Sequence, residues 1–171
     1  VEFFRGIENP VGVKIGPGAD VEEVLGLVRT LNPRREAGKV MLIARMGVRH
    51  VGEALPPILE GVAASGEPVL WSCDPMHGNG IKTKGGVKTR DCDAILDELE
   101  RTIDIHQRVG TNLGGVHFEL TGEDVTECVG GAVGIGEDDL HLNYASPCDP
   151  RLNYQQSLEL AFLLAGRMRR P

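Results

Sequence analysis

Short apolar runs alternate with longer segments of mixed polarity along the whole chain of 171 residues. The runs are apolar at nearly every position, which predicts buried strands. In the longer segments apolar residues recur every three or four positions, which predicts helices. Strands are expected at residues 11–15, 40–45, 68–73 and 115–120, and helices at residues 21–31, 52–64, 91–109 and 158–168. This strand–helix repetition predicts an α/β fold in which helices flank parallel strands.

Local signals predict where some of these elements begin. Asp20 stands where the first helix needs an N-cap. Pro56 and Pro57 interrupt the second helical pattern, so we expect that helix to start late or to be kinked, because proline lacks the backbone N–H. Residues 74–90 are rich in glycine and lysine and predict a long loop.

The predicted strand–helix units can be arranged in two ways. Four units amount to half of an eight-stranded (β/α)8 TIM barrel, and a small doubly wound sheet is the competing architecture. Polar residues stand at the end of one strand after another, where barrel enzymes carry their chemistry, and this favours the half barrel. A half barrel alone would leave two parallel edge strands unpaired, so we expect another half to accompany it.

Charge and cysteine usage narrow the class of protein. Acidic residues number 25 and basic residues 18, and the formal charge of −7 argues against a nucleic-acid binder. No apolar run reaches the length of a membrane span and no signal peptide is recognisable, so a cytoplasmic protein without membrane contact is expected. Free or metal-proximal thiols are expected at the four cysteines, which form no Cys-x-x-Cys pair: Cys73, Cys92, Cys128 and Cys148.

Two cations stand at the ends of successive strands. Lys14 lies on the strand face opposite the apolar side chains, and Arg45 closes the next strand. Two cations that converge on one pocket of an acidic protein indicate a phosphate or carboxylate ligand, which arginine can bind through two parallel hydrogen bonds. The alternative is a pair of structural ion pairs with carboxylates of neighbouring loops, and the pattern alone leaves both open.

Metal-ligating residue types follow the later strands. His117 and Glu119 share one face of the fourth predicted strand, His77 follows the third, and Asp149 lies late in the last connection. One imidazole and two carboxylates from separate strand ends would suit Mn²⁺, Co²⁺, Fe²⁺ or Zn²⁺. The spacing matches no compact metal motif, so hydrogen-bonding roles remain open, as does the choice among His117, Glu119 and Glu123.

The remaining candidates are interpreted as structural or solvated. His50, His106 and His141 fall in predicted helices or an acidic loop. The loop after the third strand is basic and is expected to be solvated and mobile, with a second phosphate as the alternative; its cations are Lys82, Lys84, Lys88 and Arg90. The paired glycines form no dinucleotide fingerprint, so no nicotinamide cofactor is expected.

Longer blocks of sequence carry a family resemblance. They read RGIENPVGVKIGP at residues 5–17, ARMG at 44–47, WSCDPMHGN at 71–79, KTR at 88–90, GGVHFELTGE at 114–123, VTEC at 125–128 and CDPRLN at 148–153. In content and order they resemble the type II 3-deoxy-D-arabino-heptulosonate-7-phosphate (DAHP) synthases. The resemblance covers essentially the whole chain and implies that residues 1–171 are the C-terminal half of a single TIM-barrel catalytic domain, supplying roughly its last four βα units.

The resemblance also implies roles for individual residues. Lys14 and Arg45 match residues that bind phosphoenolpyruvate, while His77, Glu119 and Asp149 match three of four metal ligands. His117 and Cys148 would lie beside these ligands and support them. The metal would be Mn²⁺ or Co²⁺, with Zn²⁺ or Fe²⁺ as alternatives. The fourth ligand of the family is a cysteine of the N-terminal half, and no cysteine of this chain matches its motif.

The implied activity is that of a transferase. Phosphoenolpyruvate condenses with erythrose 4-phosphate to give DAHP and phosphate, the first step of the shikimate pathway to chorismate and the aromatic amino acids. The implied partners are the N-terminal half of the barrel and further copies in a homo-oligomer, and the location is the cytoplasm, or the plastid in a plant. This segment alone would be incomplete. The alternatives are a sister synthase of specialised metabolism, of the phenazine or amino-DAHP type, and a non-catalytic assembly or regulatory module.

Overall fold

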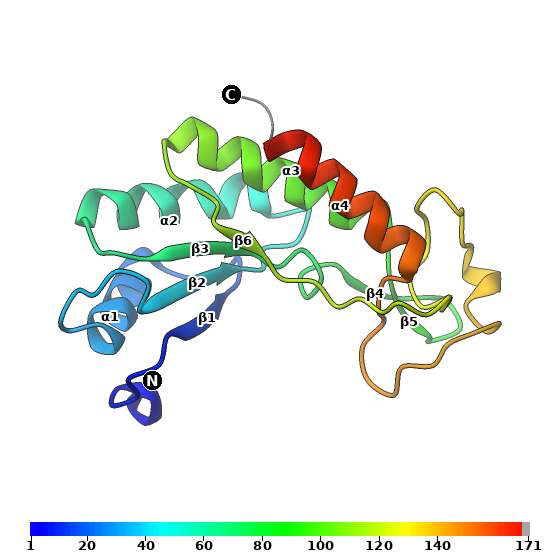
Figure 1. The fold of residues 1–171 in the computed structure, drawn as a ribbon, viewed down its shortest axis with the longest axis horizontal. Coiled ribbons are helices and arrows are strands. Elements are labelled where there is room, and N and C mark those ends of the chain that lie inside the picture. The colour runs from blue at the N-terminus through cyan, green and yellow to red at the C-terminus, as the bar shows by residue number, and fades with distance from the viewer. Residues whose placement is uncertain (169–171) are drawn as a thin grey trace. The chain divides into compact units, whose positions relative to one another are not determined.

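The computed structural model describes residues 1–168 and confirms an α/β fold with a parallel sheet (Figure 1). Its strands are β1 (Val11–Ile15), β2 (Val40–Ala44), β3 (Leu70–Cys73), β4 (Gly80–Lys82), β5 (Lys88–Arg90) and β6 (Gly115–Val116). Its α-helices are α1 (Val21–Leu31), α2 (Val51–Ser65), α3 (Cys92–Val109) and α4 (Tyr154–Met168). Short 3-10 helices occupy Glu2–Phe4 and Glu137–Asp139.

The chain divides into two compact units. The first consists of Val1–Gly78 and Glu98–His117, and the second of Asn79–Asp97 together with the chain from Phe118 onward. The parallel sheet, α1 and α2 belong to the first unit, whereas the β4–β5 hairpin and α4 belong to the second.

The sheet of the first unit contains β1, β2, β3 and β6 in chain order, all parallel. Its register sets Lys14 beside Ile43, Ile43 beside Ser72, and Ser72 beside Gly115. Burial alternates along β1 and β2, so one face packs into the core, and this confirms the predicted parity of the first strand. On the opposite face, Leu70 is 42% exposed.

The helices of the first unit cover the buried face of the sheet. Buried side chains of α1 and α2 form one core cluster with Val11, Leu42 and Trp71, and α3 adds Ile105. The N-cap predicted for α1 is confirmed, because the Asp20 carboxylate accepts hydrogen bonds from the backbone N–H groups of Glu22 (2.9 Å) and Glu23 (3.2 Å).

The helix α2 begins earlier than its prolines predict. It runs from Val51 through Pro56 and Pro57, so the expected late start is wrong. These prolines remove only two backbone donors, those that would bond to the carbonyls of residues 52 and 53. The apolar face of α2 is fully buried on both sides of the prolines, at Leu55 and Leu59 for example. Packing of that face outweighs the missing hydrogen bonds.

Two glycines allow the loops after β2 and β3 to touch. Gly47 has a φ of +81°. A Cβ atom added at Gly47 would lie 2.7 Å from the carbonyl oxygen of Gly78, closer than carbon and oxygen atoms can approach. The backbone that follows Arg45 therefore packs directly against the backbone that follows His77.

The second unit contains a hairpin that the sequence did not predict. β4 and β5 pair antiparallel within the predicted loop, with Gly80 opposite Arg90. Arg90 is 2% exposed, which corrects the expectation that this basic segment is wholly solvated. Lys82 and Lys84 are exposed, as expected for the solvated part of this segment.

Helix α4 begins four residues earlier than predicted because Asn153 and Gln156 cap it reciprocally. The Asn153 side chain accepts from the Gln156 backbone N–H at 2.9 Å, and the Gln156 side chain accepts from the Asn153 backbone N–H at 3.2 Å. The amide of Gln156 also donates to the carbonyl of Cys128, 3.0 Å away. The cap thus attaches α4 to the preceding loop.

The fourth parallel strand is shorter than predicted. β6 pairs with β3 only at Gly115 and Val116, because β3 ends at Cys73 and offers no partner further on. Glu119 therefore lies outside a strand. Leu120 instead forms a parallel bridge with Leu152 inside the second unit.

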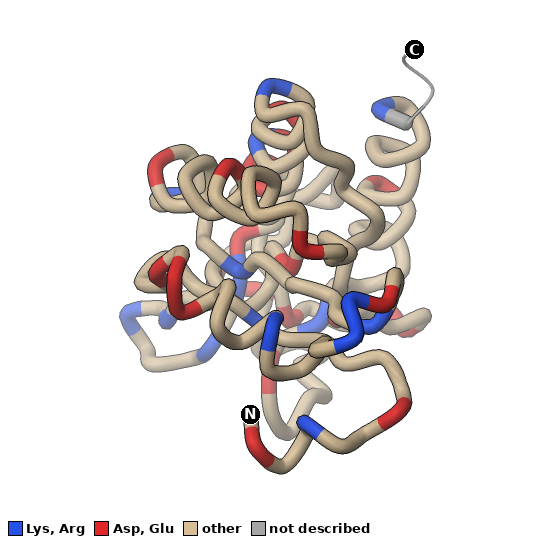
Figure 2. The backbone as a smooth tube through the Cα atoms, turned by 90° about the vertical axis from the view of Figure 1, so that its left-hand side faces the viewer, with Lys and Arg blue, Asp and Glu red and all other residues tan. Residues whose placement is uncertain are grey.

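Charged residues of both signs are interspersed along the backbone (Figure 2). The excess of acidic residues is therefore not confined to one segment of the sequence. Within residues 1–168, no helix has the length and apolar character needed to cross a membrane.

Candidate functional site

Lys14 lies on the exposed face of β1, near the carboxyl end of the strand. Its side chain is 37% exposed, and its Nζ atom lies 2.8 Å from Oδ2 of Asp74, which follows β3 directly. Lys14 is thus an exposed cation with a buried counter-ion, and the ion pair that the sequence left open is present. A lysine ammonium has three N–H donors, so this ion pair does not exhaust its capacity to bind an anion.

Asp74 is a buried carboxylate of the first unit with four bonded groups around it. Its side chain is fully buried and accepts from the backbone N–H groups of Met76 (3.0 Å) and His77 (3.1 Å), besides Lys14 and the His77 ring. Burial alone would raise the pKa of Asp74, but the hydrogen bonds from Lys14 and His77 outweigh it, and the net pKa is lowered. Asp74 is therefore ionised, and its hydrogen bonds stabilise the turn that carries His77.

The ring of His77 is oriented by Asp74. Its Nδ1 atom lies 2.8 Å from Oδ2 and 3.0 Å from Oδ1 of that carboxylate. The ring of His117 lies nearby, with a centroid separation of 6.0 Å. Ligand atoms of Asp74, His77 and His117 all lie within 4.8 Å of one another, a spacing compatible with a metal ion.

Arg45 donates from Nη2 to the backbone carbonyl of His77, at 2.9 Å. The loop behind it is held by Glu98 of α3, whose buried Oε1 accepts from the backbone N–H groups of Met46 (3.0 Å) and Gly47 (2.9 Å). Arg45 and Lys14 therefore both contact the turn that contains His77. Within the first unit, the structure brings together two cations and an imidazole at the carboxyl ends of adjacent strands.

Glu119 and Asp149 belong to the second unit, and each carboxylate is paired with a cation of β5. Arg90 Nη1 lies 2.5 Å from Oε2 of Glu119, and Lys88 Nζ lies 3.5 Å from Oδ1 of Asp149. Arg90 also donates to the backbone carbonyl of Pro150. Residues of β5 thus bind both carboxylates.

Asp149 is held in its ionised form. Burial works to raise its pKa, but the charge and hydrogen bond of Lys88 outweigh burial and lower it. The Sγ atom of the exposed Cys148 lies 3.7 Å from Oδ2 of Asp149. The side chain of Cys148 therefore contacts that of the candidate ligand.

A buried ion pair between Glu127 and Arg151 fixes the loop that carries Asp149. Arg151 donates to both carboxylate oxygens of Glu127, at 2.7 Å from Nη2 and 3.0 Å from Nε. The same carboxylate accepts from the backbone N–H groups of Ala145 and Ser146. Glu127 thereby holds the backbone before Asp149 and the Arg151 side chain after it.

The sequence-based candidates do not include three of these supporting residues, Asp74, Glu98 and Glu127. They include Arg90 only as a solvated cation. Asp74 had a usable signal, because an aspartate three residues before His77 can accept backbone N–H groups in a turn. The partners of Glu98 and Glu127 lie far away in the sequence, so no local pattern could reveal them.

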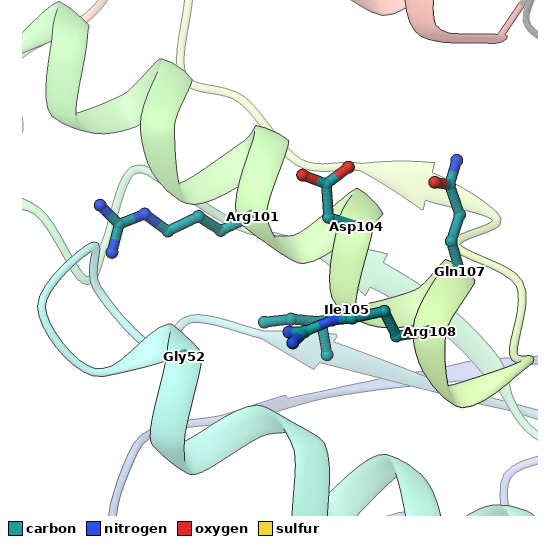
Figure 3. Close-up of a pocket in the computed structure, with 6 residues that line it drawn as sticks. All are labelled: Gly52, Arg101, Asp104, Ile105, Gln107 and Arg108. Atoms are coloured by element: carbon teal, nitrogen blue, oxygen red, sulfur yellow. The ribbon is translucent and has the colours of Figure 1, made fainter.

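A separate hollow of about 670 Å³ lies between α2 and α3 in the first unit. Figure 3 shows Ile105 and Arg108 on the side of α3 that faces Gly52, while Asp104 and Gln107 point away from it. The residues that line this hollow are mostly charged or polar, and none of the predicted site residues is among them. It is therefore not the candidate site.

Fold and site together define a parallel α/β protein with two cations, a histidine and a buried aspartate at the ends of its strands. The sequence model of the class-II DAHP synthetase family matches residues 1–165, and the chain belongs to that family.

Relatives with curated names carry the same description. The chain is 53% identical over 171 residues to the phospho-2-dehydro-3-deoxyheptonate aldolase of Neurospora crassa, covering 99% of the chain and 36% of the relative. It is 50% identical over 169 residues to the aldolase AroG of Mycolicibacterium smegmatis, covering 99% of the chain and 36% of the relative. For the Streptomyces coelicolor aldolase the identity is 49% over 169 residues, covering 99% of the chain and 38% of the relative. The chain therefore spans little more than a third of the length of these relatives.

Proposed function

We propose that this chain supplies part of the active site of a DAHP synthase, which condenses phosphoenolpyruvate with erythrose 4-phosphate. Membership of the class-II family and relatives named phospho-2-dehydro-3-deoxyheptonate aldolase support the proposal. The observation that carries it is the cluster of Lys14, Arg45, Asp74 and His77 at the ends of three adjacent parallel strands.

The four parallel strands form the C-terminal half of a (β/α)8 barrel in this proposal. Two features of the sheet support a barrel over a doubly wound sheet. The strands lie in chain order without the reversal that a doubly wound sheet requires. The core cluster also lies on one face of the sheet, as in a barrel wall covered by helices on its outside only. The N-terminal half of the barrel would complete the inner face.

Lys14 and Arg45 bind phosphoenolpyruvate in this scheme. Both approach the same turn, Lys14 through Asp74 and Arg45 through the carbonyl of His77. A trianionic ligand between them would be bound by two fixed cations, one of which has a planar guanidinium suited to phosphate or carboxylate.

His77, Glu119 and Asp149 are the proposed ligands of a divalent metal, Mn²⁺ or Co²⁺. The donor set of one imidazole and two carboxylates fits either ion, and also Fe²⁺ or Zn²⁺. The contacts of these three residues with neighbouring side chains support the assignment. Asp74 holds the ring of His77, and Arg90 pairs with Glu119. Lys88 pairs with Asp149 and lowers the pKa of that carboxyl. His117 and Cys148 lie beside these residues and would orient them.

The residues of this chain would then act by binding and orientation. Lys14 and Arg45 would hold phosphoenolpyruvate with C3 toward the aldehyde carbon of erythrose 4-phosphate. A C3–C1 bond forms, water adds at C2 of the former phosphoenolpyruvate, and phosphate leaves. When bound, the metal would supply Lewis acidity toward the aldehyde oxygen.

The test uses the full-length protein that contains these residues. Consumption of phosphoenolpyruvate with erythrose 4-phosphate should require added Mn²⁺ or Co²⁺, and mass spectrometry should identify DAHP as the product. His77→Ala should lower kcat/KM roughly 100-fold or more, because a ligand is lost, while His141→Ala, at an exposed histidine, should leave it unchanged. Turnover of another aldehyde in preference to erythrose 4-phosphate would point to a sister synthase. Full activity of His77→Ala would rule out the proposed metal site.

A further inference from the structure

Asp74 makes contacts that no role in substrate binding requires. Its fully buried carboxylate bonds to Lys14 Nζ, to the Nδ1 atom of His77, and to the backbone N–H groups of Met76 and His77. These four donors match the capacity of a carboxylate, which offers about four lone-pair sites. Asp74 is therefore an acceptor already satisfied by protein groups, which argues against direct coordination of a metal.

The tautomer of His77 follows from two competing contacts on Nδ1. That atom lies 2.8 Å from the Asp74 carboxylate and 3.2 Å from the Lys14 ammonium. If Nδ1 carries the proton, it donates to Asp74, and the lone pair of the ring is on Nε2. If Nδ1 instead accepts from Lys14, its lone pair faces a carboxylate at hydrogen-bond distance, which is repulsive, and the proton lies on Nε2.

The shorter contact and the opposite charge favour donation from Nδ1 to Asp74. Only in that tautomer does neutral His77 offer Nε2 as a metal ligand. The ammonium of Lys14 already donates to Oδ2 of Asp74, so it does not require the His77 ring as an acceptor. The negative charge of Asp74 thus attracts the Lys14 ammonium and keeps it from donating a hydrogen bond to Nδ1 of the imidazole.

We propose that Asp74 is a positioning residue: it holds His77 as the Nδ1–H tautomer, so that Nε2 can bind the metal despite a lysine 3.2 Å from Nδ1. This inference rests on the proposed metal site. If Asp74 acts in this way, the effect of replacing it on metal binding depends on whether Lys14 is present. A purely structural role would show no such dependence.

The experiment titrates Mn²⁺ alone into the full-length protein, without substrate. Asp74→Ala is used instead of an asparagine, because an asparagine amide group would itself donate to Nδ1 of His77 from the position of Oδ2. In Asp74→Ala no side chain accepts from the His77 ring or attracts the Lys14 ammonium. Lys14 should then donate to Nδ1 and favour the proton on Nε2, and the Kd for Mn²⁺ should rise roughly 10–100-fold. Combining Asp74→Ala with Lys14→Met removes the competing donor and should restore the Kd to within about threefold of that of Lys14→Met.

Glu67→Gln is the matched control. Glu67 is also a buried carboxylate of the first unit that pairs with two cations, Arg29 and Arg35, through Oε1. It contacts no candidate ligand, so Glu67→Gln should lower the melting temperature without changing the Kd for Mn²⁺.

Each outcome decides the inference. An unchanged Kd in Asp74→Ala overturns it, and so does a weakened Kd that removal of Lys14 fails to restore. Complete loss of binding in both variants would make Asp74 a ligand. If Asp74→Ala alone does not fold, the double variant is compared with Lys14→Met, and a tenfold difference in Kd overturns the inference. The titration contains no substrate, so it decides the role of Asp74 independently of the assay for DAHP. A protein that binds Mn²⁺ but does not form DAHP would refute the proposed function only.

Discussion

At the scale of single residues, buried charges in this chain are paired within their own unit. Asp74 is paired with Lys14 in the first unit, and Glu127 with Arg151 in the second. An ion buried without a partner costs several kcal/mol, so such pairs fix the geometry of the segments that carry them. The segments concerned carry His77 and Asp149, the candidate ligands.

Arg45 provides a test of anion binding at this scale. Replacing Arg45 by lysine in the full-length enzyme keeps the charge but removes the planar fork, so one of two parallel hydrogen bonds to phosphoenolpyruvate is lost. The KM for phosphoenolpyruvate should rise roughly 10–100-fold, as expected for losing a charged hydrogen bond of about 1.5–3 kcal/mol. Steady-state kinetics measure it, with Arg49→Lys as control, because Arg49 is exposed four residues away. Unchanged KM and kcat in Arg45→Lys would count against the anion pocket.

His106 gives the chain a predictable sensitivity to acid. It is 2% exposed, its Nδ1 atom lies 2.8 Å from Thr111 Oγ1, and burial lowers its pKa from 6.5 to about 4. Between these values the unfolded chain binds a proton that the folded chain does not, so stability falls as the pH decreases through this window. The loss reaches roughly 3 kcal/mol below the folded pKa, at about 1.4 kcal/mol for each pKa unit.

Denaturant unfolding at several values between about pH 7 and pH 5 measures this effect. His106→Gln should be less stable than the wild type near neutral pH but should lose less stability on acidification. His141→Gln, at an exposed position, should follow the wild type. Parallel pH profiles for the wild type and His106→Gln would show that His106 is not the group responsible.

At the scale of elements, the sequence predicted what depends on local pattern. The strands Val11–Ile15 and Val40–Ala44, the cap at Asp20 and the parity of Lys14 follow from periodicity and capping chemistry. The errors occur where partners are distant. β6 is short because β3 ends early, and the β4–β5 hairpin depends on pairing within a segment that looks like a loop.

The candidate site was likewise predictable from the sequence only in part. Strand-end positions indicated Lys14, Arg45 and His77, and the structure brings these three together. The choice of Glu119 over His117 and Glu123 required the family resemblance, and the metal-binding roles of Glu119 and Asp149 stay predictions. Asp74 was missed because its importance lies in four simultaneous contacts, which no spacing rule reports.

The close approach of two loops gives a prediction about elements. Gly47→Ala must adopt a φ of +81° and place a Cβ against the carbonyl of Gly78, so it should destabilise the protein by about 1–3 kcal/mol from backbone strain alone. Gly26→Ala is the opposite case. Gly26 lies within α1 with open space around it, and alanine there should stabilise by roughly 0.5–1 kcal/mol. Thermal unfolding of both variants measures the difference, and equal melting temperatures would contradict the close approach.

At the scale of the whole molecule, the sheet of residues 1–168 has two open edges, β1 and β6. Parallel strands are ordinarily covered on both faces, yet Leu70 is 42% exposed on the face opposite the helices. The family relatives are almost three times as long as this chain. An open parallel sheet of this kind is what the proposed half barrel requires.

The last prediction follows from the proposed function. Residues 1–171 expressed alone should bind Mn²⁺ or Co²⁺ weakly and should not turn over, because the proposed ligands His77, Glu119 and Asp149 would number only three. The fourth ligand implied by the family resemblance, a thiolate, would add charge and a softer donor. Calorimetric titration of the metal and an assay of phosphoenolpyruvate consumption with erythrose 4-phosphate test both parts. A separately expressed N-terminal half should raise the metal affinity and restore activity, since it would pair the open strand edges and contribute the missing ligand. Turnover by residues 1–171 alone, at the rate of a full-length synthase, would mean instead that the site is complete within this chain.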